Sequence, residues 1–224
     1  MRLRVLVPVL ALALGGCASS DDSFLWTLAP VNERDARAYA AVPGERFRIP
    51  AADLSKLPPK YRRQLVRYDT PHKPGTIVVD PGARFLYLVA ENGRAIRYGV
   101  EVGREGLEWS GTATIARRAE WPTWTPPAEM IARDPKVAPF AAGMPGGPEN
   151  PLGARALYLY QGGKDTLYRI HGGGAAGRIG EATSSGCVRL LDQDAIDLYK
   201  RVPNGAEVVV LPARVAGGEQ KTRL

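Results

Sequence analysis

The chain has 224 residues, of which 45% are hydrophobic, and its formal net charge is +7. These values exclude a disordered polymer and suit one globular domain of ordinary size with extensions at its ends. The 25 glycines and 19 prolines gather in particular stretches, which indicates long ordered loops within that domain.

The N-terminus has the pattern of an export signal. Two arginines precede an apolar run from Val5 to Leu14 that is too short to span a bilayer. The next residues, Gly-Gly-Cys, complete a stretch that resembles the bacterial lipobox, in which the cysteine becomes the lipidated first residue of the mature chain. We therefore predict a lipoprotein signal peptide over residues 1–16 and lipidation at Cys17. A plain secretory signal with an incidental cysteine is the alternative.

Ala18 follows this cysteine at the position where an aspartate usually retains Gram-negative lipoproteins at the inner membrane. We therefore expect a periplasmic protein whose lipid anchor holds it in the outer membrane. This compartment disfavours nucleic acid as a partner. The positive charge suits an acidic polymer such as cell wall, or anionic lipid, unless it only keeps the surface soluble.

Export also limits what the second cysteine can do. If Cys17 carries lipid, Cys187 has no intramolecular partner in an oxidising compartment. It is then buried and inert, paired between chains, or kept for its reactivity. One cysteine with two histidines cannot build a structural zinc site, and we predict no metal.

Residues 17–75 are expected to hold the lipidated N-terminus, a tether and a small helical extension. Within them, residues 33–41 predict a short helix and residues 54–68 predict a second one, interrupted by a Pro-Pro pair. His72 lies in a connector rich in proline and is expected to be an exposed bystander.

From Thr76 onward the pattern changes to strands. Two runs rich in Val, Ile, Leu and Tyr, at residues 84–91 and 94–103, flank Asn92-Gly93. This pair tolerates the positive φ of a type I′ turn and predicts a hairpin. A further strand is expected at residues 76–80.

A second hairpin is predicted from residues 155–160 and 167–171, joined by the sequence QGGKDT. Because side chains alternate along a strand, Leu167, Arg169 and His171 should share one face. A last strand is expected at residues 206–211.

The clearest helix is predicted at residues 192–202. Asp192 can cap its N-terminus, and apolar residues recur at helical spacing along it. We expect this helix to pack against the sheet rather than to take part in catalysis. The elements together predict a mainly β protein with a few helices, an α+β fold, followed by a tail at residues 212–224.

Between residues 120 and 153 lies a long stretch without periodicity. Such segments inside a compact domain are usually functional or disordered. Trp121 and Trp124 stand beside prolines that restrict the backbone, which favours order and a binding wall or lid. Alternatively, the tryptophans simply cover the sheet.

The stretch from residue 169 to 190, RIHGGGAAGRIGEATSSGCVRL, holds one of the two histidines and one of the two cysteines. An imidazole near a thiol can accept its proton, or can pair with the thiolate as imidazolium. The small residues before Cys187 would let a substrate carbonyl approach main-chain N–H donors, as an oxyanion hole requires. On spacing alone, a glycine-rich turn with a buried cysteine and a structural histidine remains the alternative.

This stretch resembles the signature of the L,D-transpeptidase catalytic domain (YkuD-type). That signature is a His-Gly pair, a gap of about fifteen residues, then Ser/Thr-His-Gly-Cys, an aliphatic residue and Asn or Arg. Here His171-Gly172 opens the motif and Val188-Arg189 follows Cys187. The sequence NPLG at residues 150–153 also resembles the family, and the likeness covers roughly residues 76–211.

The resemblance implies a β-sandwich-like catalytic domain over residues 76–211, with Cys187 as nucleophile and His171 as general base. The carbonyl of Gly172 would orient the imidazole. The remaining implied site residues are the oxyanion donors Gly186 and Cys187, the site-shaping Arg189, and the cleft residues Trp121, Trp124, Asn150 and Gly153.

The implied reaction is acyl transfer on peptidoglycan stem peptides without a cofactor. The thiolate would attack the carbonyl at the L-centre of diaminopimelate in a tetrapeptide stem, expel D-Ala and pass the acyl group to an amine, forming a 3→3 cross-link. Other acceptors would give protein anchoring to the wall, D-amino-acid exchange or, with water, carboxypeptidase action.

One position departs from the family pattern. Ser185 stands where the family has the histidine before Gly-Cys, so any contact of that histidine to substrate or oxyanion is in doubt. Two alternatives remain open, the first because of Ser185 and the second because hydrolysis and transfer share the same acyl-enzyme. One is a catalytically silent peptidoglycan-binding lipoprotein, and the other is an L,D-carboxypeptidase or amidase on the same fold.

Overall fold

The computed structural model describes residues 32–103, 109–183 and 187–213. The expected signal peptide, Cys17, Ser185, Gly186 and most of the C-terminal tail lie outside the described residues. No helix in the described part of the chain is long and apolar enough to cross a membrane.

The described residues form a sheet of eleven strands with a few short helices, which confirms the prediction of a mainly β protein. The strands are β1 (Gln64–Arg67), β2 (Ile77–Asp80), β3 (Phe85–Ala90), β4 (Arg94–Gly99), β5 (Glu101–Gly103), β6 (Gly111–Glu120), β7 (Arg155–Gln161), β8 (Lys164–His171), β9 (Ala182–Thr183), β10 (Val188–Arg189) and β11 (Glu207–Val210). The helices are α2 (Glu33–Ala38), α4 (Ala128–Arg133) and α5 (Asp192–Arg201), with 3-10 turns η2 (Pro59–Tyr61), η3 (Pro135–Phe140) and η4 (Ala176–Arg178). Across the sheet the order is β1-β4-β3-β2-β11-β6-β7-β8-β10-β5-β9.

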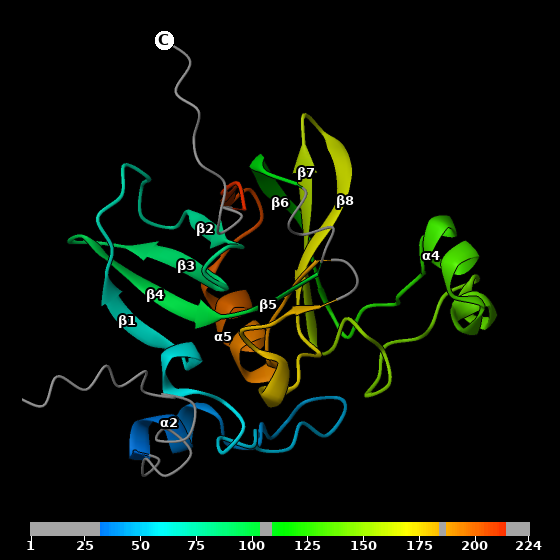
Figure 1. The fold of residues 1–224 in the computed structure, drawn as a ribbon, viewed down its shortest axis with the longest axis horizontal. Coiled ribbons are helices and arrows are strands. Elements are labelled where there is room, and N and C mark those ends of the chain that lie inside the picture. The colour runs from blue at the N-terminus through cyan, green and yellow to red at the C-terminus, as the bar shows by residue number, and fades with distance from the viewer. Residues whose placement is uncertain (1–31, 104–108, 184–186, 214–224) are drawn as a thin grey trace, which may run out of the picture.

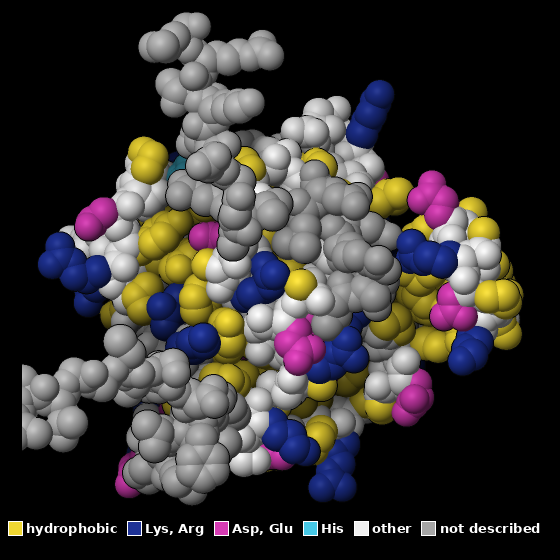
Figure 2. Space-filling model, in the orientation of Figure 1, with side chains coloured by type: hydrophobic (Ala, Val, Ile, Leu, Met, Phe, Trp, Pro, Cys, Tyr) yellow, Lys and Arg dark blue, Asp and Glu magenta, His cyan; other side chains and the backbone are white. Residues whose placement is uncertain are grey.

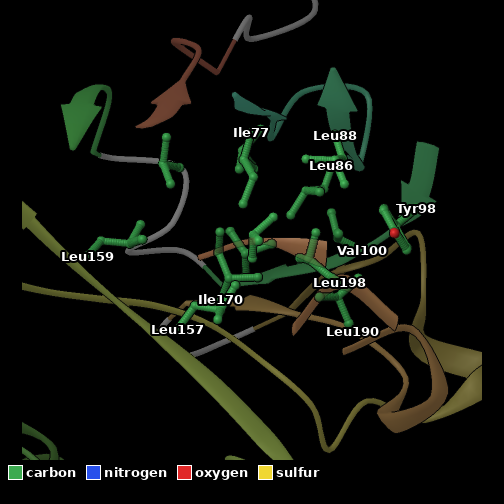
Figure 3. Packing of buried hydrophobic residues seen from close by; sticks show 14 of the residues in the cluster. Ile77, Leu86, Leu88, Tyr98, Val100, Leu157, Leu159, Ile170, Leu190 and Leu198 are labelled. Atoms are coloured by element: carbon green, nitrogen blue, oxygen red, sulfur yellow. The ribbon is translucent and has the colours of Figure 1, made fainter. Parts of the chain in front are cut away.

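The sheet bends so that its two halves share one hydrophobic core. In Figure 1, strands β1 to β4 lie at a steep angle to strands β6 to β8, with α5 between the two groups. Figure 3 shows how side chains from both halves converge: Ile77, Leu86 and Leu88 meet Leu157 and Ile170. Leu198 of α5 is fully buried in the same cluster. The predicted helix therefore packs against the sheet, as expected from its apolar face.

Both predicted hairpins are present. Asn92 and Gly93 have φ values of 59° and 62°, as a type I′ turn requires. The second hairpin turns at Gly162 and Gly163, with φ values of 56° and 78°, so its loop is shorter than the sequence indicated. β8 accordingly begins at Lys164.

The prediction that Asp192 caps its own helix is wrong. The cap position of α5 is Leu191, which makes no side-chain cap. The Asp192 carboxylate instead accepts hydrogen bonds from the backbone N–H groups of Ala154 and Gly173, at 2.8 and 3.0 Å. These donors belong to other segments, which a local capping rule does not consider.

The N-terminal extension has one predicted helix, α2, but the helix predicted at residues 54–68 is absent. Two prolines remove backbone donors at that place, and the chain makes only the turn η2 before it enters β1. β1 pairs with β4 at one end of the sheet order, so the extension contributes a strand to the domain. His72 is half-buried, where the sequence predicted an exposed side chain.

Polar contacts hold the extension against α5. Tyr39 is 1% exposed and its hydroxyl donates to Asp194 at 3.1 Å, and the Arg63 guanidinium lies 3.2 Å from Asp197. Asp194 lies in the first turn of α5 and is itself buried. Burial, the largest effect, raises the pKa of Asp194 to about 7 against the influence of Arg63.

The long stretch from residue 120 to 153 is ordered and carries helices that the sequence did not predict. It leaves the sheet after β6, forms α4 and η3, and returns through an antiparallel bridge between Trp124 and Met144. In Figure 1 this arm projects to the right of the sheet, and Figure 2 shows apolar side chains on it. Neither α4 nor η3 has a buried residue.

Candidate active site

Two parallel strands bring Cys187 and His171 to the same side of the sheet. β10 pairs with β8 in the register Val188 to Ile170 and Arg189 to His171. Val188 and Ile170 are buried in the core, so the residues that alternate with them face away from it. Cys187 lies directly before β10 and is half-buried. Its sulfur accepts from the backbone N–H of Arg169 at 3.2 Å and donates to the carbonyl of Leu167 at 3.7 Å.

A cavity of about 300 Å³ opens over these two residues. It is lined by Cys187, His171, Arg189, Leu167 and Arg169 from the motif region, by Arg117 and Tyr158 from the neighbouring strands, and by Thr123, Trp124, Thr125, Pro127, Met130, Pro151 and Leu152 from the arm. Leu167, Arg169 and His171 therefore share a face, as the strand pattern predicted. None of the described residues of the N-terminal extension lines this cavity.

The imidazole of His171 is held in one orientation. Its Nδ1 lies 2.8 Å from the carbonyl oxygen of Gly172. Because a carbonyl oxygen only accepts hydrogen bonds, Nδ1 carries the proton and Nε2 is the basic nitrogen. This is the contact that the family resemblance implied for Gly172.

The ring of His171 is neutral in the folded protein. Burial lowers the pKa of His171 to about 3, and the guanidinium groups of Arg189 and Arg169 act in the same direction. The hydrogen bond to Gly172 opposes these effects only in part. Because the resting ring is neutral, the thiol proton would move to His171 during the attack. A thiolate–imidazolium pair that already exists before the attack is disfavoured.

Arg189 lies beside the site and is held by a buried carboxylate. It pairs across β10 and β5 with Glu101, and its Nη1 lies 3.0 Å from the Glu101 carboxylate. Glu101 is 1% exposed, and Arg178 approaches it at 3.5 Å. The described residues contain no cluster of three His, Cys, Asp or Glu side chains that could hold a metal ion.

Close backbone packing supports the site from behind. Gly153 has a φ of 62°, and a Cβ at this position would collide with the backbone of Gly173 and with the Asp192 carboxylate. A Cβ on Gly172 would also meet that carboxylate. The end of the arm, the glycines after His171 and the start of α5 are therefore packed without room for a methyl group.

Of the two tryptophans predicted to form the cleft, one lines the cavity and the other packs on the extension. Trp124 lines the cavity, whereas Trp121 lies outside the cavity lining and is 8% exposed. The Trp121 indole packs edge-on against Phe47 and donates to Glu45 of the extension at 2.9 Å.

Asn150 and Gly153 also lie outside the described cavity lining, although the two residues between them line it. The Asn150 side chain is buried and donates to the carbonyls of Pro122 and Met144, at 2.9 and 3.1 Å. These hydrogen bonds hold the beginning and the end of the arm together.

Sequence reasoning missed several residues of the site. Arg117 and Tyr158 line the cavity, and Asp192 fixes the backbone behind it. Tyr158 could have been found from strand alternation, since its neighbours in β7 are apolar. Arg117 and Asp192 could not be found in this way, because their positions depend on strand register and on contacts between distant segments.

The model of the L,D-transpeptidase catalytic domain family matches residues 74–210 of the chain. The chain belongs to this family. The match includes both Cys187 and His171, and it covers the region that the motif alone had suggested.

Curated relatives of the family carry the same name. The probable L,D-transpeptidase YbiS of Escherichia coli K12 is 35% identical over 151 residues, which are 65% of this chain and 47% of that protein. The chain thus spans about half the length of this relative. A protein of Fuscovulum blasticum, named as an L,D-transpeptidase in the ATP synthase subunits region (ORF 5), is 31% identical over 81% of this chain and 98% of its own length.

A crystal structure from Brucella melitensis is also similar. It is described as a probable carnitine operon oxidoreductase and is 54% identical, covering 68% of this chain and 95% of that chain with a TM-score of 0.48. The description of the Brucella protein concerns that protein alone.

Proposed function

We propose that the chain is an L,D-transpeptidase that acts on peptidoglycan stem peptides through a cysteine acyl-enzyme. The observation that carries this proposal is the shared cavity of Cys187 and His171, in which the imidazole is oriented by the carbonyl of Gly172. A half-buried thiol and a neutral, oriented imidazole that line one cavity are the two groups that nucleophilic catalysis by cysteine requires.

In the first step, Nε2 of His171 takes the thiol proton while the sulfur of Cys187 attacks the carbonyl carbon at the L-centre of diaminopimelate. The tetrahedral intermediate then expels D-Ala, whose nitrogen receives the proton from His171. A thioester remains on Cys187. In the second step an acceptor amine loses a proton to His171 and attacks the thioester, which forms the new amide and restores the thiol.

Positive charge in the cavity stabilises the anions that form during the reaction. Arg169 and Arg189 line the cavity, and their fields favour a developing thiolate and an oxyanion while they disfavour an imidazolium. We further propose that the N–H groups of Gly186 and Cys187 donate to the oxyanion and that Ser185 supplies one hydrogen bond in place of the family histidine.

Acylation of the thiol is the direct test. The full chain is incubated with a carbapenem, an acylating agent for this family, and its intact mass is measured. We expect an adduct on the wild-type protein and on His72→Gln, and none on Cys187→Ala or His171→Gln. A folded, reduced wild-type chain that stays unmodified would support the silent peptidoglycan-binding lipoprotein instead.

Transfer and hydrolysis are separated by their products. With tetrapeptide muropeptides as substrate, transfer to a stem produces 3→3 dimers, and transfer to an added D-amino acid produces exchanged stems. Tripeptide without either product would assign the chain as an L,D-carboxypeptidase. A wall-anchored protein acceptor would appear as a covalent protein–muropeptide adduct.

We also propose that Cys17 is lipidated after removal of residues 1–16, and that the protein is held in the periplasm at the outer membrane. The residues between Cys17 and the described extension would then tether the domain near the wall. Labelled palmitate should enter the wild-type chain but not Cys17→Ser. Incorporation that persists in that variant would remove the proposal.

A further inference from the structure

The cavity has a strongly uneven charge. Three arginines line it, Arg117, Arg169 and Arg189, and no aspartate or glutamate is among its described lining residues. Two of these arginines are compensated, because Arg169 forms a bidentate pair with Asp165 at 2.6 and 2.7 Å and Arg189 lies 3.0 Å from Glu101.

Arg117 differs from the other two. Within the described parts of the chain its guanidinium makes no direct ion pair, although its charge, after the contacts of Arg169 and Leu167, contributes to a lowered pKa of Asp165. The contact of Arg117 is with the ring of Tyr158, whose centroid lies 4.5 Å from the guanidinium carbon. Arg117 is exposed, so its charge is available to a molecule in the cavity.

A β-bulge turns Arg117 toward the cavity. Opposite β7, Ile115 pairs with Leu159 and Arg117 pairs with Tyr158, so Ala116 is an extra residue in β6. Ile115 and Leu159 are buried in the core, whereas Tyr158 lines the cavity. Without the extra residue, strand alternation would direct Arg117 into the core.

Arg117 and the nucleophile belong to one row that crosses β6, β7 and β8 and ends at the residue before β10. Arg117 pairs with Tyr158, Tyr158 pairs with Arg169, and the backbone N–H of Arg169 reaches the sulfur of Cys187. The Tyr158 ring contacts both guanidinium groups, at 4.5 Å for Arg117 and 4.4 Å for Arg169.

This row sets the distance from the thiol to the guanidinium of Arg117. Three strand spacings of ~4.8 Å separate the backbones of Arg117 and Cys187. Because the Arg117 guanidinium leans over Tyr158, one strand nearer to the thiol, it lies roughly 10 Å from the sulfur.

We propose that Arg117 binds a carboxylate of the acyl donor and thereby selects stems in which this carboxylate is not amidated. The inference rests on the proposed function. Two carboxylates of a stem attached through the L-centre of diaminopimelate extend to about this distance: the one at the far end of the diaminopimelate side chain and the α-carboxylate of the γ-linked D-Glu. The carboxylate of the leaving D-Ala is only about one residue length, ~3.8 Å, from the attacked carbon, which is too close.

The test crosses protein variants with amidated donors. The full chain and its Arg117→Gln, Arg117→Lys and Arg67→Gln variants are assayed with tetrapeptides that are unmodified, amidated on D-Glu, or amidated on diaminopimelate. Arg67 is an exposed arginine on β1 and serves as the matched control.

We expect Arg117→Gln to raise KM for the unmodified donor about tenfold while kcat changes little, since the contact is present in ground and transition states alike. Amidation of the bound carboxylate should raise the wild-type KM similarly and should cancel the further effect of Arg117→Gln. Arg117→Lys should keep part of the affinity, and Arg67→Gln should match the wild type.

The amidated donor on which the variant effect disappears identifies the bound carboxylate. An equal effect of Arg117→Gln on all three donors, or no effect on any, overturns the inference. If the wild-type chain consumes none of the tetrapeptides, it is the proposed function that fails.

Discussion

Removal of the Asp192 carboxylate is expected to weaken both the fold and the site. In the structure this carboxylate accepts from the N–H groups of Ala154 and Gly173, at 2.8 and 3.0 Å. A hydrogen bond to a charged group contributes about 1.5–3 kcal/mol, and Ala154 is fully buried, so its N–H would lose its partner without gaining water. Asp192→Ala should therefore lower the free energy of unfolding by about 3 kcal/mol and the melting temperature by about 10 °C.

The same change should slow acylation of Cys187. Gly173 follows the glycine whose carbonyl orients His171, so a looser backbone there leaves the imidazole less well placed, with a cost of about tenfold in rate. Thermal unfolding and the rate of the carbapenem mass shift measure the two effects. Asp192→Asn keeps an oxygen acceptor in the same place and should lose about 1 kcal/mol. Wild-type stability and rate in Asp192→Ala, or equal losses in the two variants, would refute this reasoning.

Two further predictions concern the packing and the protonation state of the site. Gly153→Ala combines a positive φ of 62° with a collision against Gly173 and Asp192, and we expect it to lose about 3 kcal/mol. Gly162→Ala also has a positive φ but meets nothing within 4 Å, and should lose about 1 kcal/mol; equal losses would mean that the collision is relieved. Burial, then two nearby arginines, lower the pKa of His171 to about 3, so between pH 6.5 and 3 the unfolded chain binds the proton and the folded chain does not. The contribution of His171 to the free energy of unfolding is complete above pH 6.5 and decreases as the pH falls. The free energy of unfolding of the wild type, measured in urea relative to His171→Gln, should therefore fall by about 2 kcal/mol from pH 7 to pH 5. A constant difference would mean that the folded ring titrates normally.

Local patterns predicted much of the sheet. The Asn92-Gly93 pair between two alternating apolar runs was sufficient for the first hairpin, because positive φ at both turn positions is a property of those two residues. Alternation in β8 likewise placed Arg169 and His171 on one face, where both line the cavity. The helix predicted at residues 54–68 failed because its apolar residues pack in a connector and an edge strand, which periodicity does not distinguish.

The sequence by itself therefore determined the mainly β class, both hairpins, the helix against the sheet and the motif that contains Cys187 and His171. Only the tertiary structure decided that Asp192 serves the backbone of two distant segments, that Trp121 packs on the extension, and that Arg117 faces the cavity. The physical reason is the range of the interactions. Turn chemistry and alternation act between near neighbours, whereas a bulge, a register or a shared carboxylate exists only once segments far apart in the chain lie side by side.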